Sequence, residues 1–338
     1  MTEWAFLLTP LLVLPIMLLF RFVGCGTLLE LEPDDTPPPP PRYRDYIMGE
    51  PNNPGIVKND KVMPSKSDVI AYWRLVDAPT SKVAKDEKGF QDGSFTQTAQ
   101  SIPEQAPTPT SPGSEGASGS FFPYHFSLVD SDVPSKCRIF DGGYVLVPFK
   151  DGLYTDEFTI ECWIFPGTLA SEWTKNTGYE HTLFSAGGFY RVPFSPSTDS
   201  TFQGFRIFAD RDNHWQMNIF SVPGTVFATP PLIPRDDKTH AAVRTHLAVT
   251  VQKDTANVDN RIVTLFIDGK AAAIQTIGYY ALPDRAPLLI GVGDAAHPLD
   301  ADSPRPYQPI MSSIQEVVLY RKALSGDEIA NHVDINRK

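Results

Sequence analysis

The sequence predicts an all-β fold, an antiparallel sandwich of two sheets, with an apolar N-terminal segment before it and a short helix at its end. From about Val69 onward, many short runs alternate apolar and polar residues, as strands with one buried face do. Turn residues separate these runs, and no long amphipathic helix lies between them. Proline makes up 32 of the 338 residues, and proline is costly inside helices and central strands.

The composition is that of a globular protein with one or two domains. Hydrophobic residues account for 41% of the chain and charged residues for 20%, which excludes wholesale disorder. The formal net charge is -11 at pH 7. An acidic surface repels phosphate backbones, so we do not expect a nucleic-acid partner.

Residues 1–29 are predicted to form a transmembrane anchor. The stretch 5–20 carries no charge, and the apolar character resumes after Arg21 and continues to Leu29, a total of 25 residues from position 5. A helix needs about 20 such residues to span a bilayer. One alternative is a lipoprotein signal, because the residues before Cys25 resemble a lipobox, although the positive n-region of a signal is missing. The other is a buried helix of a soluble protein, against which the acidic, proline-rich stretch that follows argues.

Residues 30–66 are predicted to be a proline-rich linker. Five consecutive prolines lie at 37–41 and favour stiff polyproline II, and no hydrophobic periodicity follows them. The linker either holds the domain away from the bilayer or lies along a partner protein, with Tyr43, Tyr46 and Ile47 as its anchors.

Residues 67–338 are predicted to form the β domain, with a low-complexity insertion at 97–120 that is rich in Ser, Thr, Pro and Gly. The clearest strand is 246–251, in which Leu247, Val249 and Val251 share one face. The segment 261–270 is a strand that runs into Asp268-Gly269, a strong hairpin signal. The other predicted strands are 70–75, 137–140, 144–148, 158–165, 181–185, 205–209, 215–220, 288–292 and 313–320.

One helix is predicted near the C-terminus. Ser325 and Glu328 form a capping box before Ile329, which indicates a short helix that runs to about His332.

An ordered series of motifs resembles the laminin-G-like (concanavalin A-like) jelly-roll family over roughly residues 69–334. The motifs are AYWRL at 71–75, FDGGYV at 140–145, FTIECW at 158–163, THLAVT at 245–250, LFIDGK at 265–270, LIG at 289–291 and IQEVVLYRKALS at 314–325. The resemblance implies a two-sheet jelly roll, usually on secreted or surface proteins, that binds glycans or proteins. Members commonly have Asp where this chain has Gln315, which argues against a family-type calcium site that uses that carboxylate.

The side of the membrane is indicated by two signals that disagree. No Lys or Arg precedes the apolar run, whereas Arg42 and Arg44 follow it, which weakly favours a cytoplasmic domain. The resemblance implies an extracytoplasmic domain. We therefore expect a membrane-anchored protein whose globular domain lies on the periplasmic or extracellular side.

No catalytic site is predicted. The Glu-x-Asp-x-x-Glu signature of glycosidases with this type of fold is absent. Glu157 and Glu161 lie four residues apart, about 13 Å along a strand, which exceeds the carboxylate separations used in hydrolysis. We expect both to be solvated charges at a strand edge. The seven histidines show no zinc-binding spacing, and His246 is expected to form a hydrogen bond on a strand face.

We predict no cofactor-binding or metal-binding residues, but two acidic groups are candidates for calcium. Their carboxylates are hard oxygen ligands of the kind that calcium prefers, although acidic loops are commonly just solvated. The two groups are Asp86, Glu87 and Asp92, and Asp294, Asp300 and Asp302.

Of the three cysteines, Cys25 belongs to the apolar segment, and Cys137 and Cys162 lie in predicted strands. We expect the latter two to be buried free thiols, with a disulfide between them as the alternative. Eight aromatic residues near predicted loops are expected to pack mostly in the core, and a minority would face a partner. They are Phe121, Phe122, Tyr124, Phe189, Tyr190, Phe194, Phe202 and Phe205.

The function that the sequence predicts is that of a membrane-anchored, non-catalytic binding module, an accessory or scaffold subunit that contacts other protein subunits of a membrane complex. The alternative is an extracytoplasmic glycan-binding, lectin-like protein, for which calcium would be a cofactor. A degenerate glycosidase is the third hypothesis.

Overall fold

A computed structural model of the chain describes residues 43–48, 67–77, 81–96, 125–129, 137–141, 143–166, 180–187, 203–219, 225–234, 243–283, 285–294 and 306–336. All of them belong to Pro41–Lys338, the larger of two compact units. The predicted anchor at 1–29 and the predicted insertion at 97–120 lie outside these ranges. Within the ranges given, no helix has the length and hydrophobicity that a bilayer crossing requires.

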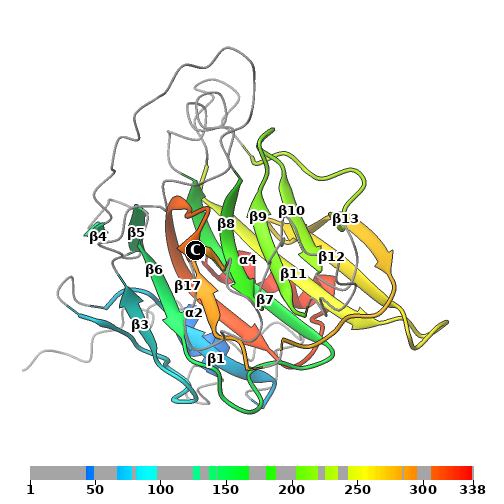
Figure 1. Cartoon of the computed structure of the whole chain (residues 1–338), viewed down its shortest axis with the longest axis horizontal. Coiled ribbons are helices and arrows are strands. Elements are labelled where there is room, and N and C mark those ends of the chain that lie inside the picture. Colours follow the sequence, from blue (N-terminus) through cyan, green and yellow to red (C-terminus); the bar gives the residue numbers. More distant parts are fainter. Residues whose placement is uncertain are drawn as a thin grey trace, which may run out of the picture. The chain divides into compact units, whose positions relative to one another are not determined.

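The described residues form two antiparallel sheets, here called sheet A and sheet B, stacked as a sandwich (Figure 1). In order across the sheet, sheet A contains β13 (Lys270–Ile277), β12 (Arg261–Ile267), β11 (Thr245–Lys253), β7 (Phe158–Pro166), β17 (Met311–Tyr320), β5 (Cys137–Asp141) and β4 (His125–Val129), and β1 (Val69–Trp73) also pairs with β17. Sheet B contains β10 (Trp215–Ile219), β9 (Phe205–Ala209), β8 (His181–Ala186), β14 (Leu288–Ile290), β6 (Tyr144–Val147), β3 (Gly93–Thr96) and β2 (Val83–Ala84). A small ribbon pairs β15 (Gly293–Asp294) with β16 (Pro306–Tyr307).

The predicted two-sheet antiparallel sandwich is confirmed, and each predicted strand is present within a few residues of its expected ends. The Asp268-Gly269 turn joins β12 to β13, with positive φ at both residues. The strands that we did not predict are short or lack alternation, namely β2, β3, β4, β13, β15 and β16.

The hydrophobic core lies between the two sheets. Leu247, Val249 and Val251 of β11 are buried, as their alternation predicted, and they share the core with Ile160 of β7 and Val145 of β6. Burying such a set of aliphatic and aromatic side chains is the main driving force for closing the sandwich. Trp73, Phe184, Phe205, Ile207, Trp215, Met217, Leu288 and Ile290 also belong to this core.

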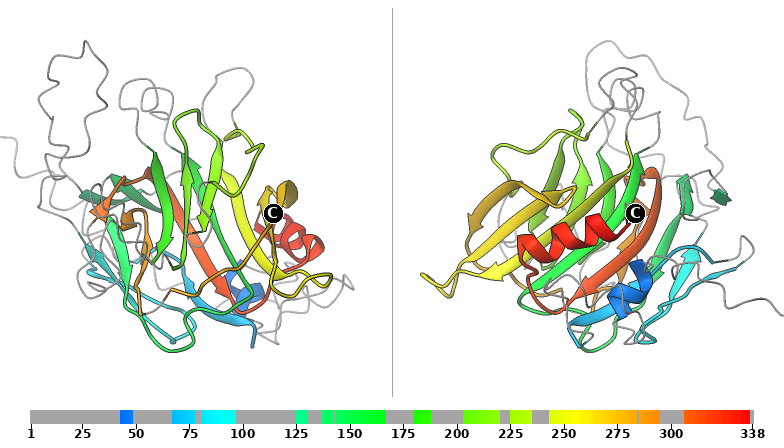
Figure 2. Two further views of the ribbon diagram at one scale, coloured as in Figure 1. Left: turned by 45° about the vertical axis from the view of Figure 1, so that its right-hand side comes forward. Right: turned by 180° about the vertical axis from the view of Figure 1, so that it is seen from behind.

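A second buried layer lies on the outer face of sheet A. The helices α4 (Gly326–Asn336) and α2 (Tyr43–Met48) both pack against this face, as the view from behind in Figure 2 shows. Their apolar side chains form a cluster with the outward-facing residues of the strands, which includes Ile47, Phe266, Val318, Tyr320 and Ile329. Residues of β7, β11 and β17 are therefore buried on both faces of sheet A.

The predicted capping box at the start of α4 is confirmed. The Ser325 backbone N–H donates to Glu328 Oε2 at 2.7 Å, and the Glu328 backbone N–H donates to Ser325 Oγ at 3.3 Å. The helix runs to Asn336, four residues beyond its predicted end, because Ile329 and Val333 continue the buried stripe that faces the sheet.

The structure differs from the sequence analysis in the region predicted to be a linker. Tyr43–Met48 forms the helix α2, in which Ile47 is fully buried and Met48 is 9% exposed. Ile47, which we considered as an anchor for a partner, thus packs on the chain's own domain. The side chains of Tyr43 and Tyr46 are not among those that the structure describes.

Candidate functional site

An open cleft of about 430 Å³ lies at the end of the sandwich where β6 leads into β7 and where β13 ends. Its size is that of a small-molecule site. Two loops far apart in the sequence form it, 149–156 and 279–283, together with Gln203 before β9. The lining residues are Phe149, Asp151, Gly152, Tyr154, Asp156, Gln203, Tyr279, Ala281, Leu282 and Pro283.

The aromatic lining of the cleft is held by packing beneath it. The rings of Phe149 and Tyr154 stack with their centroids 6.2 Å apart, and the Tyr154 hydroxyl donates to the Ala286 carbonyl at 2.9 Å. Burial, and to a smaller extent the neighbouring Tyr280, raises the pKa of Tyr154 well above its ordinary value. Tyr279, by contrast, is 64% exposed, so much of its side chain faces solvent.

The polar lining of the cleft is rich in hydrogen-bond acceptors. Asp151 and Asp156 contribute carboxylates and Gln203 contributes an amide. Lys253 Nζ lies 3.4 Å from Asp156 Oδ2 at the rim, and both side chains are about half exposed. With two carboxylates and one cation, the cleft favours a neutral ligand that donates hydrogen bonds over an anionic one.

A separate buried polar network lies beneath α4, on the outer face of sheet A. Glu161 of β7, His246 of β11 and His332 of α4 are all fully buried. His332 Nδ1 lies 2.8 Å from Glu161 Oε1, and the Tyr320 hydroxyl donates to the same oxygen at 2.6 Å. Burial alone would raise the pKa of Glu161, but His332 and His246 outweigh it and hold that pKa well below its ordinary value. The network is closed to solvent, so it stabilises the docking of α4.

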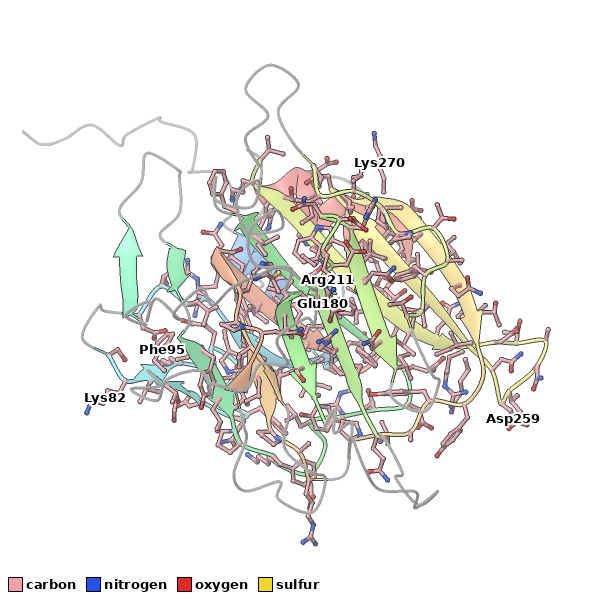
Figure 3. The ribbon with its side chains drawn as sticks, turned by 45° about the horizontal axis from the view of Figure 1, so that its top comes forward. Lys82, Phe95, Glu180, Arg211, Asp259 and Lys270 are labelled. Atoms are coloured by element: carbon pink, nitrogen blue, oxygen red, sulfur yellow. The ribbon has the colours of Figure 1, made fainter. Side chains whose placement is uncertain are left out.

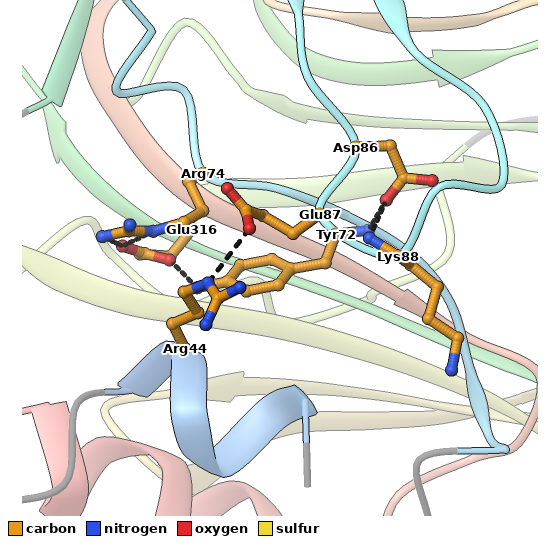
Figure 4. Close-up of polar contacts among 7 residues, drawn as sticks. All are labelled: Arg44, Tyr72, Arg74, Asp86, Glu87, Lys88 and Glu316. Carbon is orange, nitrogen blue, oxygen red and sulfur yellow. Dashed lines mark hydrogen bonds and ion pairs between the residues drawn. The ribbon is translucent and has the colours of Figure 1, made fainter. Parts of the chain in front are cut away.

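A second polar cluster surrounds Glu316, which lies at a bulge in β17 with a φ of 55° (Figure 4). The Tyr72 hydroxyl donates to Glu316 Oε2, and Arg74 Nη2 lies 3.4 Å from Oε1. At the edge of the cluster, Arg44 of α2 donates from Nε to Glu87 Oε2 at 3.0 Å. Burial raises the pKa of Glu316, although Arg74 and Tyr72 oppose the rise. The cluster joins α2 and β1 to the bulge of β17.

The expectation that Glu157 and Glu161 are solvated charges is wrong for Glu161. Glu161 is fully buried because α4 covers this face of sheet A, which alternation within β7 does not reveal. Glu157 is half-buried, and its Oε1 accepts the Lys253 backbone N–H at 2.8 Å. His246 packs edge-on against Trp163 with ring centroids 5.2 Å apart, and its Nε2 lies 3.3 Å from Glu161 Oε2.

The first candidate calcium group is instead a turn-forming network. The Asp86 carboxylate accepts backbone N–H groups from Tyr72, Lys88, Phe90 and Gln91 at 2.6–2.9 Å. Asp92 Oδ1 accepts the Asp86 backbone N–H at 2.8 Å, and Glu87 pairs with an arginine. A carboxylate occupied in this way has little capacity left for a cation. In the described part of the chain, no three His, Cys, Asp or Glu side chains are grouped so that they could hold a metal ion.

The remaining predictions are tested in part. The side chain of Asp294, and the whole of Asp300 and Asp302, lie outside the described residues. Cys162 is a buried free thiol, as expected, so it forms no disulfide, and burial raises its pKa. Of the eight aromatic residues near loops, Phe205 lies in the core, and the other seven are not described.

The sequence analysis did not single out the cleft residues. The Asp151-Gly152 dipeptide marks a turn, and Tyr279 follows the end of a strand. Neither local signal indicates that these two loops meet, because their proximity depends on the pairing of β7 with β11 and of β12 with β13.

The architecture described above agrees with a comparison against protein families. The model of the concanavalin A-like lectin/glucanases superfamily matches residues 141–330, more than half of the chain. The chain belongs to this superfamily. The match contains β6 to β17 and the beginning of α4, up to Ala330. Among curated proteins, none matches the chain in sequence.

Several solved structures are similar to the chain. One is domain 4 of AbnA, a GH43 extracellular arabinanase from Geobacillus stearothermophilus, in complex with arabinotriose. It is 16% identical to this chain, with a TM-score of 0.45, and the match covers 79% of this chain and 98% of that domain. Trypanosoma rangeli sialidase is 13% identical, with a TM-score of 0.45, and the match covers 80% of this chain and 33% of the sialidase. The binding domain of Paraclostridial Mosquitocidal Protein 1 is 14% identical, with a TM-score of 0.45 and coverage of 79% and 52%.

Proposed function

We propose that the protein is a non-catalytic binding module that holds a neutral glycan in the cleft at the end of the sandwich. The observation that carries the proposal is the combination of an exposed Tyr279 with the acceptors Asp151, Asp156 and Gln203 around one open cleft. The superfamily, which is named for lectins and glucanases, is compatible with this ligand.

The chemistry of the lining suits a sugar ring. A pyranose presents an apolar C–H face and a rim of hydroxyl donors. Tyr279 and Leu282 supply an apolar surface for the face, and the two carboxylates and the amide accept hydrogen bonds from the rim. The carboxylates disfavour acidic sugars, since like charges repel.

We propose binding without hydrolysis. Glycosidic cleavage requires a general acid whose pKa is raised by burial, placed opposite a second carboxylate. Asp151 and Asp156 both lie in exposed positions. The buried carboxylates among the described residues belong to Asp86, Glu161, Glu316 and Glu328, and none of them lines the cleft.

The test is a glycan array with the full chain in mild detergent, followed by calorimetric titration of the best neutral ligand. We expect Tyr279→Ala to weaken binding at least tenfold, about 1.4 kcal/mol. Leu232→Ala is the matched control, because Leu232 is 63% exposed, close to the 64% of Tyr279, but lies outside the cleft. Equal affinities of the two variants, or no glycan bound at all, would contradict the proposal.

Prolonged incubation with the same oligosaccharide tests the absence of catalysis. Mass spectrometry should show the ligand intact. Cleavage products that disappear in Asp156→Asn would show that the cleft is an active site after all.

A second candidate function is that of a scaffold subunit anchored in a membrane on its periplasmic or extracellular side. It is favoured by exposed apolar side chains on the described surface, among them Val258 at 70% and Ile274 at 65%, because such side chains are suited to protein contacts. Extraction in detergent and native sizing test it. A protein that fractionates with the soluble pool and copurifies with no other subunit would exclude this candidate.

A further inference from the structure

The cleft at the end of the sandwich contains a carboxylate, that of Asp151, without a partner of its own. Among the described residues, none forms an ion pair or a hydrogen bond with this carboxylate. Asp151 is exposed and lies in a turn that the Leu153 backbone N–H closes by donating to the Lys150 carbonyl at 2.9 Å. The turn therefore presents an unpaired negative charge to the cleft from a defined position.

The lysines nearest to this charge are held elsewhere. Lys150 Nζ donates to the Phe90 carbonyl at 2.6 Å and lies 4.6 Å from the centroid of the Phe90 ring. Lys253 Nζ pairs with Asp156 at the rim. No Lys or Arg is among the described residues that line the cleft. A cation that balances Asp151 must therefore come from the solvent or from a ligand.

Three aromatic side chains also line the cleft, those of Phe149, Tyr154 and Tyr279. The faces of aromatic rings carry negative electrostatic potential and attract an ammonium group that lies within about 6 Å of the ring centroid. Phe149 and Tyr154 are half-buried and stack on each other, which fixes them, and Tyr279 is mostly exposed. An organic ammonium therefore gains from these rings as well as from Asp151, whereas a hydrated metal ion gains only from the carboxylate.

The remainder of the lining favours an ammonium that is attached to a sugar. Leu282 and Tyr279 form an apolar surface, and Gln203 and Asp156 accept hydrogen bonds from hydroxyl groups. An amino sugar has the same ring face and hydroxyl rim as a neutral sugar, with one hydroxyl replaced by an ammonium group. It therefore matches all three kinds of group in the cleft, namely the apolar surface, the acceptors and the unpaired carboxylate.

We propose that the cleft binds glycans that carry a protonated amino group more tightly than their neutral counterparts, and that Asp151 is the residue that binds the ammonium. This inference rests on the proposed function, because it concerns the same cleft. It extends that function by naming the class of glycan that the cleft selects.

Calorimetric titration of the full chain in mild detergent with two tetrasaccharides of the same linkage tests the inference. One is the β-1,4-linked tetramer of glucosamine, and the other is cellotetraose, which has a hydroxyl in place of each ammonium. At about pH 6 the amines are protonated and the aspartates are ionised. We expect the glucosamine tetramer to bind about tenfold more tightly, because an exposed ion pair contributes up to about fivefold and a cation–π contact about twofold more.

Asp151→Asn preserves the size of the side chain and removes its charge, so it should bring the two affinities within about twofold of each other. Asp212→Asn is the matched control, because Asp212 is also exposed but lies in the β9–β10 turn, at the opposite end of β9 from Gln203. Figure 3 shows Arg211, next to Asp212, well apart from Asp259 in the hairpin that follows Lys253. The control should keep the tenfold difference.

A change of pH provides a readout that does not depend on a substitution. At about pH 9.5 the amines lose their protons while the aspartates stay ionised, so the wild type should bind the two tetrasaccharides alike.

Equal affinities of the wild type at the lower pH, or a difference that persists in Asp151→Asn, would overturn the inference and leave the proposed function intact. Failure of the glucosamine tetramer to bind would overturn it as well. A tetralysine peptide that binds as tightly as this tetramer would assign Asp151 to a cationic peptide and would likewise overturn it. The proposed function fails separately, if the glycan array identifies no ligand or if Tyr279→Ala binds like Leu232→Ala.

Discussion

Replacing the buried carboxylate of Glu161 should destabilise the fold strongly without exposing any new surface. Glu161→Gln preserves the size of the side chain but removes its charge. The amide has one acceptor oxygen in place of two, while Tyr320 and His332 both contact the carboxylate at 2.6–2.9 Å. The other carboxylate oxygen is replaced by an N–H₂ group, which donates hydrogen bonds and does not accept them. This group would face either His332 Nδ1 or the Tyr320 hydroxyl, where the wild type has a carboxylate oxygen.

The magnitude follows from the burial of all the partners. A hydrogen bond to a charged group contributes about 1.5–3 kcal/mol to stability. Removing one member of a buried ion pair lowers the free energy of unfolding by about 3–5 kcal/mol. Because Glu161, His246 and His332 are fully buried, water cannot replace the lost contact. We therefore expect the free energy of unfolding to fall by about 3–5 kcal/mol.

Urea unfolding followed by circular dichroism measures this change. Glu157→Gln is the matched control on the same strand. Glu157 is half-buried, and its contact is a carboxylate oxygen that accepts the Lys253 N–H, a role that an amide oxygen retains. The control should cost less than about 1 kcal/mol. Equal losses for the two variants would refute the reasoning that the network beneath α4 is an ionic one.

Four further predictions concern the pH dependence of the Glu161 contribution, the cost of replacing Glu316, backbone strain and the docking of α2. The pKa of Glu161 is lowered, so its contribution to stability is present above pH 4.5 and is lost as the pH falls below that value. The difference in the free energy of unfolding between the wild type and Glu161→Gln, measured in urea, should therefore shrink from pH 5 to pH 3. A difference that stays constant over this range would contradict the prediction. The pKa of Glu316 is raised, so folding disfavours its charge, and Glu316→Gln should cost less than Glu161→Gln at pH 7. Gly187→Ala should lower the midpoint of thermal unfolding more than Gly89→Ala. Both glycines have a positive φ, but only at Gly187 would the new Cβ meet a backbone oxygen, that of Gln203 at 2.0 Å. Ile47→Ala should remove hydrogen-exchange protection from Tyr43–Met48, whereas Arg44→Ala, which breaks a partly exposed ion pair, should leave most of it in place.

The sandwich itself was predictable because its signals are local. Alternation in β11, the Asp268-Gly269 turn and the Ser325–Glu328 capping box each depend on a few neighbouring residues, and each appears in the structure as expected. The helix α2 was missed because six residues that follow a proline run show no periodicity. It is stabilised by contacts with distant residues, namely the apolar cluster that contains Val318 and Ile329 and the ion pair of Arg44 with Glu87. Glu161 was misjudged for a related reason, since α4, which covers it and contributes its partner His332, lies far from it in the sequence.

The sequence alone therefore determined the fold class, the positions of most strands and the family resemblance, because these follow from the spacing of neighbouring residues. Only the tertiary structure decided that the acidic residues Asp86 and Glu161 serve the fold and that Tyr279 and Asp151 border one cleft. Burial and proximity arise from strand order and from what covers each sheet face, and the local pattern of residues does not encode them.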